Sequence, residues 1–463
     1  MQVRWKRQVI GLIAALAASG ALLAGSVTAS VAATEPDMTP APLYGVNYDY
    51  AGAATFHNVN VGPLLAQLDP ATLRYPGGTE ADYFDWSEGK PTNSSSSYEF
   101  KLAKLYDAYQ ATGAPPIFDL NVLTPGNQLN TADQVQMLAD ARSLGLPVKY
   151  VEIGNELYGG GATGTFAKAF PTGHAYGTTV ALYVKTLHRD FPGVQVAADA
   201  VLNGSTTREQ QWNTQLLATA TGAGAPDALI LHDYPGLTDN PFTAADVPPL
   251  FANAYTAISD LASTVRSLGK PVWLTEYNFR GPYVPPKQRK PNPVQNSYAR
   301  ELYVAEFALM LPRIPDLTLA DYFTAVEQGT VFGAWANPAD PTLTPAGQAV
   351  EMIDAAARGA AGSVAITVPG APTLPGGDPA VTGQAFTGPG RPTTAVLVNL
   401  TGSAQNVPVS ALVPDGARYQ RVTGQPTAKQ TAAGPLTAGT VTGTTLRLPA
   451  YSITLVNTTT GAR

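Results

Sequence analysis

Two glutamates in this sequence directly follow short apolar runs, and together they could cleave a glycosidic bond. Glu156 ends the stretch YVEIGNE (150–156), and Glu276 ends PVWLTE (271–276). Hydrolysis with retention needs one carboxyl group that protonates the leaving oxygen and one carboxylate that attacks the anomeric carbon, roughly 5–5.5 Å apart. Such proximity is expected to raise the pKa of the acid. The amide of Asn155, beside Glu156, could bond the sugar 2-hydroxyl.

The elements that place these glutamates form a regular pattern between residue 43 and about residue 358. Short apolar runs predict eight strands, at Leu43–Asn47, Thr72–Tyr75, Pro116–Asn121, Lys149–Asn155, Val194–Asp199, Ala228–His232, Val272–Glu276 and Leu319–Phe323. Longer patterns predict helices at Tyr98–Thr112, Thr131–Leu144, Ala175–Phe191, Asn253–Leu268, Ser297–Leu311 and Pro345–Ala357. Gly113, Gly145 and Gly269 stand where three of these helices should stop.

Eight strands that alternate with helices predict an α/β fold, a (β/α)8 barrel over residues 43–358. A doubly wound open sheet would give a similar pattern, but no G-x-G-x-x-G follows an early strand. In a barrel, the carboxyl ends of the strands meet at one face. Glu156 and Glu276 end the fourth and seventh strands, so we expect them to converge there.

The two ends of the chain differ from the barrel. Residues 359–463 are rich in Thr, Val, Gly and Pro and predict an all-β sandwich domain, to which residues 34–42 could add. Residues 1–33 resemble a signal peptide, with basic residues at 4, 6 and 7, an apolar run and a cleavage site near Ala32 or Ala33. The alternative is an uncleaved membrane anchor. We expect a secreted protein that is not attached to a membrane after cleavage.

The composition and the missing motifs argue against several other classes of function. The net charge of −6 gives no electrostatic basis for a nucleic-acid partner, and the absence of cysteine excludes disulfides and thiolate chemistry. The four histidines are scattered, so the sequence predicts no metal site and no cofactor. No G-x-S-x-G nucleophile elbow is present.

Taken in order, several segments resemble clan A glycoside hydrolases, in particular the α-L-arabinofuranosidases of family 51 and the β-glucuronidase/heparanase-like family 79. The segments are LRYPGG (73–78), FDLN (118–121), GNE (154–156), LHDY (231–234) and LPAYSITL (448–455). The resemblance implies that Glu156 is the general acid/base and Glu276 the nucleophile. It also implies a set of substrate-binding or supporting residues, namely Asn155, Arg74, Asn121, Tyr234 and His232.

Some residues allow two interpretations. Arg74 could orient Glu276 or form a structural salt bridge within the barrel, and His232 could line the pocket or be structural. Trp86, Trp273 and Trp335 could stack on a sugar ring, although Trp273 is more typical of a core residue.

The substrate stays open between an arabinofuranoside and a β-glucuronide. Family 51 has a glutamate on its first strand that helps to hold the furanose, whereas this chain reads LYGVNYD (43–49), where Asn47 or Asp49 could replace it. The basic loop 280–290 after Glu276 could clamp an anionic sugar, or it could simply be solvated. A glycosidase acting on an oligo- or polysaccharide is the first hypothesis. The second is a catalytically inactive carbohydrate-binding envelope protein on the same barrel.

Overall fold

The structure, a computed structural model, describes residues 39–48, 61–93, 99–123, 131–160, 164–236, 242–279, 294–325, 332–335, 342–409 and 415–457. The predicted signal peptide (1–33), Asp49 and the basic loop 280–290 lie outside these residues. Within the described part of the chain, no helix combines the length and apolar character that crossing a membrane requires.

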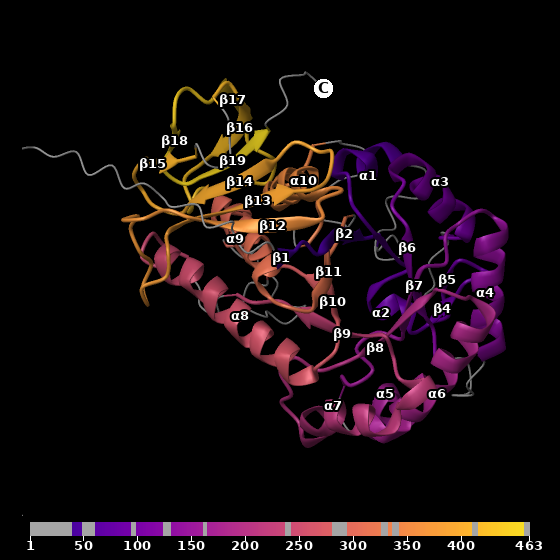
Figure 1. Ribbon diagram of the computed structural model, residues 1–463. Helices are drawn as coiled ribbons and strands as arrows, with labels where there is room; N and C mark the ends of the chain where they lie inside the picture. Colours follow the sequence, from indigo (N-terminus) through magenta and orange to yellow (C-terminus); the bar gives the residue numbers. More distant parts are fainter. Residues whose placement is uncertain are drawn as a thin grey trace, which may run out of the picture. The chain divides into compact units, whose positions relative to one another are not determined.

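Eight parallel strands close into a barrel (Figure 1). They are β2 (Leu43–Asn47), β3 (Leu73–Tyr75), β6 (Pro116–Leu120), β7 (Tyr150–Ile153), β8 (Gln195–Asp199), β9 (Ala228–Asp233), β10 (Val272–Tyr277) and β11 (Leu317–Tyr322). The last strand, β11, pairs with the first, β2, so the sheet has no free edge. The predicted barrel is confirmed, and every observed strand overlaps its predicted range.

Helices follow the strands and lie on the outside of the barrel, as α3, α4, α6 and α8 show in Figure 1. The helices are α1 (Gly62–Leu68), α2 (Gly78–Ala81), α3 (Leu102–Thr112), α4 (Thr131–Ser143), α5 (Thr165–Ala169), α6 (Gly173–Asp190), α7 (Thr207–Thr219), α8 (Val247–Leu268), α9 (Tyr298–Met310) and α10 (Pro345–Ala357). Gly113 ends α3 as expected, with a φ of 66° that L-residues rarely adopt. Helix α7 was not predicted, because it buries only Trp212 and Leu216 and has no continuous apolar stripe.

The interior of the barrel has an apolar floor beneath a polar layer. The floor is one cluster of buried side chains from six strands: Ile117, Tyr150, Ala197, Ala228, Ile230, Trp273 and Leu319. Two residues further along five of these strands stand buried polar side chains: Asp119, Glu152, Asp199, His232 and Asp321. Because side chains two apart on a strand face the same side, these polar groups also point into the barrel, nearer its carboxyl-terminal end.

The C-terminal region consists of antiparallel sheets, as the sequence predicts. The larger sheet has the order β1 (Thr39–Pro40), β12 (Gly362–Thr367), β13 (Val381–Thr387), β14 (Thr394–Asn399), β19 (Ser452–Asn457), β16 (Arg418–Thr423) and β17 (Thr437–Thr440). A second pair is β15 (Gln405–Pro408) with β18 (Thr445–Leu448), and a further small pair, β4 (Phe84–Asp85) with β5 (Lys90–Pro91), follows β3. Strand β1, which precedes the barrel in the sequence, pairs with β12, which follows it.

Buried carboxyl groups in the barrel should make the protein more stable at acidic than at alkaline pH. Burial raises the pKa of Asp321 to about 8, although a hydrogen bond from Thr72 lowers it. In the unfolded chain this group titrates near pH 4, so the folded state binds the extra proton between about pH 4 and pH 8. The free energy of unfolding should therefore fall over that range, by up to about 1.4 kcal/mol per pH unit for this group.

Chemical denaturation at a series of pH values measures this slope. Asp321→Asn keeps the shape and the acceptor for Thr72 but cannot ionise, so it should make the slope shallower. Asp107→Asn, at an exposed position on α3, serves as the control and should leave the slope unchanged. Identical slopes in the wild type and Asp321→Asn would contradict the prediction.

Candidate active site

Arg74, on β3, is a completely buried cation that binds three carboxylates inside the barrel. Its Nε donates to Glu152 Oε2 at 2.6 Å, and Nη1 donates to Glu276 Oε1 at 2.7 Å. Its Nη2 donates to Asp119 Oδ2 at 2.9 Å. Burial raises the pKa of Asp119, and the charge of Arg74 opposes that rise without cancelling it. Arg74 therefore fits both interpretations, since it orients Glu276 and its salt bridges also link β3 to β6, β7 and β10.

Two asparagines take the remaining N–H groups of Arg74. Asn47 Oδ1 accepts from Nη1 at 3.0 Å, and Asn155 Oδ1 accepts from Nη2 at 2.9 Å, so all five N–H groups of the guanidinium are bonded. Asn47 also donates to the carbonyl of Thr275 at 2.6 Å and is fully buried. Asn47 therefore bonds within the protein, and Asp49, the other residue suggested in place of the family 51 glutamate, lies outside the described residues. The Asn155 amide, in contrast, keeps its N–H groups for other acceptors.

Glu276, on β10, is held at both carboxylate oxygens. Arg74 bonds Oε1, and the hydroxyl of Tyr234 donates to Oε2. Burial, and then the negative charge of Glu276, raise the pKa of Tyr234, so this hydroxyl keeps its proton and acts as a donor. The ring of Tyr234 also packs edge-on against Phe323 and Phe332, with centroids 6.0 and 5.6 Å away. These three rings form an aromatic wall beside the carboxylate.

An irregularity in β10 turns Glu276 toward the inside of the barrel. Trp273 belongs to the floor, so strict alternation would turn Glu276, three residues later, to the outside. The register of β10 against β9 shifts, however, between Leu274 and Glu276. Glu276 consequently pairs with His232, and both side chains face the barrel mouth.

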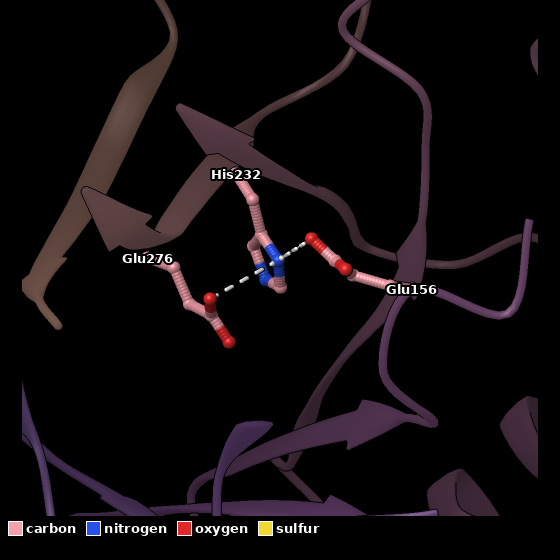
Figure 2. Close-up of side chains that lie close together, drawn as sticks. All are labelled: Glu156, His232 and Glu276. Carbon is pink, nitrogen blue, oxygen red and sulfur yellow. Dashed lines mark hydrogen bonds and ion pairs between the residues drawn. The ribbon is translucent and has the colours of Figure 1, made fainter. Parts of the chain in front are cut away.

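His232 lies between the two candidate catalytic glutamates (Figure 2). Its Nδ1 is 2.9 Å from Glu156 Oε1 and 3.6 Å from Glu276 Oε2. One carboxylate oxygen from each glutamate and a ring nitrogen of His232 all lie within 4.8 Å of one another. The sequence predicts no metal here, although this is the one cluster among the described residues whose atoms are close enough to ligate a metal ion.

The two glutamates differ in exposure and in charge environment. The side chain of Glu156 is 40% exposed, whereas that of Glu276 is 6% exposed. Burial raises the pKa of Glu156, but the hydrogen bond and the charge of His232 outweigh burial and lower it overall. The expectation of a raised pKa for Glu156 is therefore wrong. Burial lowers the pKa of His232, but the charges of Glu276 and Glu156 and the hydrogen bond to Glu156 outweigh burial and raise it overall.

Other predicted residues lie away from this cluster. Asn121 follows β6, and its amide bonds the carbonyl of Phe84 and the amide of Leu123, so it supports a loop. Trp273 and Trp335 are almost completely buried, so neither can stack on a sugar. Trp86 is half-buried and donates to an aspartate on α4 at 3.2 Å.

Glu80 is a carboxylate near the cluster that the sequence did not single out. It lies on the short helix α2, two residues after Gly78. A Cβ placed on Gly78 would be 3.6 Å from Glu80 Oε2 and 3.5 Å from the ring of Phe323, so the carboxylate lies beside the aromatic wall. Burial raises the pKa of Glu80, and the charge of Glu276 adds to the rise. An acidic residue two positions after the LRYPGG segment was the available signal.

Comparison with known proteins identifies structures that share this fold. No protein-family profile matches the chain, and no curated protein matches its sequence. A family 51 α-L-arabinofuranosidase from Bifidobacterium longum is similar in structure, with a TM-score of 0.68, 17% identity, and coverage of 92% of this chain and 100% of that one. A 4-O-α-L-rhamnosyl-β-D-glucuronidase from Fusarium oxysporum gives a TM-score of 0.59 at 14% identity, covering 91% and 97%. A glycoside hydrolase family 30 xylanase from Clostridium acetobutylicum gives 0.55 at 13% identity, covering 92% and 97%.

These similarities extend over nearly the whole length of each protein, but the sequence identities are low. They establish the class of fold. The chain shares the fold of the clan A glycoside hydrolases, as the sequence resemblance implies.

Replacement of Arg74 should destabilise the protein strongly. Arg74→Lys keeps the charge but cannot reach three carboxylates and two amides at once. Breaking a buried ion pair typically costs about 3–5 kcal/mol, so we expect a loss of that size in the free energy of unfolding. Chemical denaturation measures it, with Arg189→Lys, in an exposed ion pair with Asp190, as the control. Equal losses in the two variants would show that the buried network is dispensable.

Proposed function

We propose that this protein is a retaining glycoside hydrolase in which Glu156 is the general acid/base and Glu276 the nucleophile. The observation that carries the proposal is the meeting of the two carboxylates, within 4.8 Å by their nearest oxygens, at the mouth of a barrel. A separation of this order leaves no room for a water molecule to attack from the opposite face, as inversion requires, and it is typical of retention.

The first half of the reaction follows from the contacts of Glu276. A carboxylate oxygen attacks the anomeric carbon and forms an ester bond, while the bond to the leaving oxygen breaks. Arg74 and Tyr234 hold the carboxylate in one orientation, which supports in-line attack. The free N–H groups of Asn155 are available to the sugar 2-hydroxyl, and that interaction strengthens as charge develops on the ring.

The proton for the leaving oxygen comes from the pair formed by Glu156 and His232. The lowered pKa of Glu156 and the raised pKa of His232 favour His232 as the protonated member of the pair in the free protein. Transfer from Nδ1 to Glu156 Oε1 across 2.9 Å makes Glu156 the acid and leaves a neutral imidazole, whose Nε2 is 3.3 Å from Thr275 Oγ1. In the second half, Glu156 takes a proton from the water that attacks the anomeric carbon, and Glu276 is released. The two groups therefore titrate as a pair.

The competing hypothesis is a carbohydrate-binding protein without turnover. A panel of aryl glycosides that includes arabinofuranosides and glucuronides distinguishes a hydrolase from a binding protein. The stereochemistry of the product is followed by NMR. Glu276→Ala should abolish hydrolysis. Glu156→Ala should slow mainly substrates with poor leaving groups, because those need the acid most. Binding without hydrolysis in the wild type would favour the competing hypothesis, and an inverted product would exclude Glu276 as nucleophile.

The position of Glu80 favours an arabinofuranoside or another neutral sugar over a β-glucuronide. Its carboxylate lies beside the aromatic wall, where it can accept hydrogen bonds from sugar hydroxyls. The carboxylate of a uronic acid in the same place would be repelled by Glu80 and Glu276 together. The basic loop 280–290 could counter this repulsion only if it reached the same part of the sugar.

Glu80→Gln tests this preference, because it removes the charge and keeps the shape. The ratio of kcat/KM for a glucuronide to that for the matching neutral glycoside should rise, by about tenfold if a single like-charge contact of about 1.4 kcal/mol is relieved. Glu88→Gln is the control, because Glu88 is exposed and pairs with Lys90. An unchanged ratio in Glu80→Gln would place this carboxylate outside the sugar site.

We also propose that the protein acts outside the cytoplasm on an oligo- or polysaccharide. The support is the predicted signal peptide at residues 1–33, together with the kind of substrate that the site fits.

A further inference from the structure

The acid/base candidate Glu156 has a backbone conformation that its own sequence does not favour. Its φ is 45°, in the left-handed region, which costs a residue other than glycine about 1–3 kcal/mol. The residue lies beyond the end of β7, and its carbonyl accepts a bond from the N–H of Gly159 at 2.7 Å, which closes a tight turn. A conformation of this kind persists only where surrounding contacts impose it. The contacts that impose this conformation surround residues 156–159.

Arg208 supplies most of them, through the backbone rather than through side chains. Its guanidinium donates to the carbonyl oxygens of the three residues that follow Glu156: Leu157 at 2.6 Å, Gly159 at 3.2 Å, and Tyr158. It also donates from two nitrogens to the carbonyl of Phe170, at 3.1 and 2.8 Å. Three consecutive carbonyls in a turn point in different directions, and the forked guanidinium can bond all of them at once.

Arg208 is itself held in place at the start of α7. The helix begins with a capping box, in which the Thr206 side chain accepts from the backbone of Glu209 and the Glu209 side chain accepts from the backbone of Thr206. The guanidinium then lies 4.9 Å from the ring of Trp212, one turn along the helix. Trp212 donates to the carbonyl of Asp199 at 3.0 Å.

Asp199 completes the link, because its Oδ2 accepts from the N–H of Leu157 at 3.1 Å. The turn after Glu156 is thus bonded at its carbonyls by Arg208 and at one N–H by Asp199. In the described part of the chain, the hydrogen bonds of Arg208 go to backbone carbonyls and not to the carboxylate of Glu156 or of Glu276. Arg208 therefore acts on the backbone that carries Glu156 and does not touch the reacting atoms.

We propose that Arg208 is a positioning residue. By fixing the turn after Glu156, it holds the carboxyl group of Glu156 where that group can protonate the glycosidic oxygen. The inference rests on the proposed function, since it gives Arg208 a role only if Glu156 is the acid/base. It explains how a side chain that is 40% exposed, on a loop, can keep a fixed distance from His232 and Glu276. A displacement of about 1 Å at such a group can cost on the order of 10²-fold in rate.

The test compares Arg208→Lys with Arg391→Lys in the full-length protein. Arg391 is a matched control, because it is also half-buried and also donates to three consecutive carbonyls, those of Ala356, Ala357 and Arg358, far along the chain from the glutamates. Thermal denaturation records the structural loss in each variant. The kinetic readout is kcat/KM for aryl glycosides whose leaving groups span a range of pKa.

We expect both variants to lose comparable stability. Only Arg208→Lys should show a steeper dependence on leaving-group pKa, with about a tenfold or greater loss for the poorest leaving group and little loss for the best. A double-mutant cycle adds a second readout: in a Glu156→Ala background, Arg208→Lys should cause no further loss.

The outcomes separate the two proposals. A wild type that hydrolyses glycosides, with equal leaving-group dependence in Arg208→Lys and Arg391→Lys, overturns the role of Arg208 and leaves the proposed function intact. An additional loss in the Glu156→Ala background also overturns it, because Arg208 would then act through another group. A wild type without glycosidase activity overturns both.

Discussion

A fully buried guanidinium organises the barrel interior. Arg74 is fully buried, and each of its N–H groups is bonded to a protein oxygen, on Glu152, Glu276, Asp119, Asn47 and Asn155. Removal of a charge from water costs several kcal/mol, and only a complete set of partners in good geometry recovers that cost. The position of each partner is therefore strictly limited. Because the partners stand on or next to β2, β6, β7 and β10, the same bonds fix these four strands relative to β3, which carries Arg74.

The polar layer around Arg74 is possible because the barrel is sealed below it. The floor of Trp273, Tyr150 and their neighbours fills the lower interior, and the rings of these two residues pack edge to face at 5.5 Å. Above this floor, carboxylates outnumber the cation, and burial raises the pKa of Asp119, Asp199 and Asp321. A raised pKa disfavours the ionised form of each group, which limits the accumulation of unpaired negative charge in this layer. Glu276 belongs to the same layer, in direct contact with Arg74.

The two candidate catalytic glutamates are held in different ways, and their proposed tasks differ accordingly. Glu276 is on a strand, and two side chains fix both of its oxygens, which suits a nucleophile that must attack along one line. Glu156 is on a turn, is partly exposed and shares a proton with His232, which suits a group that must first give a proton and later take one. We propose that backbone bonds from Arg208 fix its position, while its side chain contacts His232 at 2.9 Å and Tyr158 at 3.5 Å, both through Oε1.

The sequence by itself determined the strands, most of the helices and the location of both glutamates at strand ends, because period-two and period-3.6 patterns are local properties. It also supported Arg74, Tyr234 and His232 as neighbours of the pair, through short segments that resemble a known fold. Only the tertiary structure decided the inward turn of Glu276, which depends on a register shift between β9 and β10, and the burial of Asn47 and Trp335. It alone placed Glu80 beside the aromatic wall and Arg208 beneath the turn after Glu156. The sequence could not show the role of Arg208 for two reasons. Helix α7, which carries it, has a polar sequence without a clear helical pattern. The backbone carbonyls that accept its hydrogen bonds place no requirement on the residue types at 157–159. Contacts between residues far apart in sequence are set by how the strands close into a barrel, which no local pattern encodes.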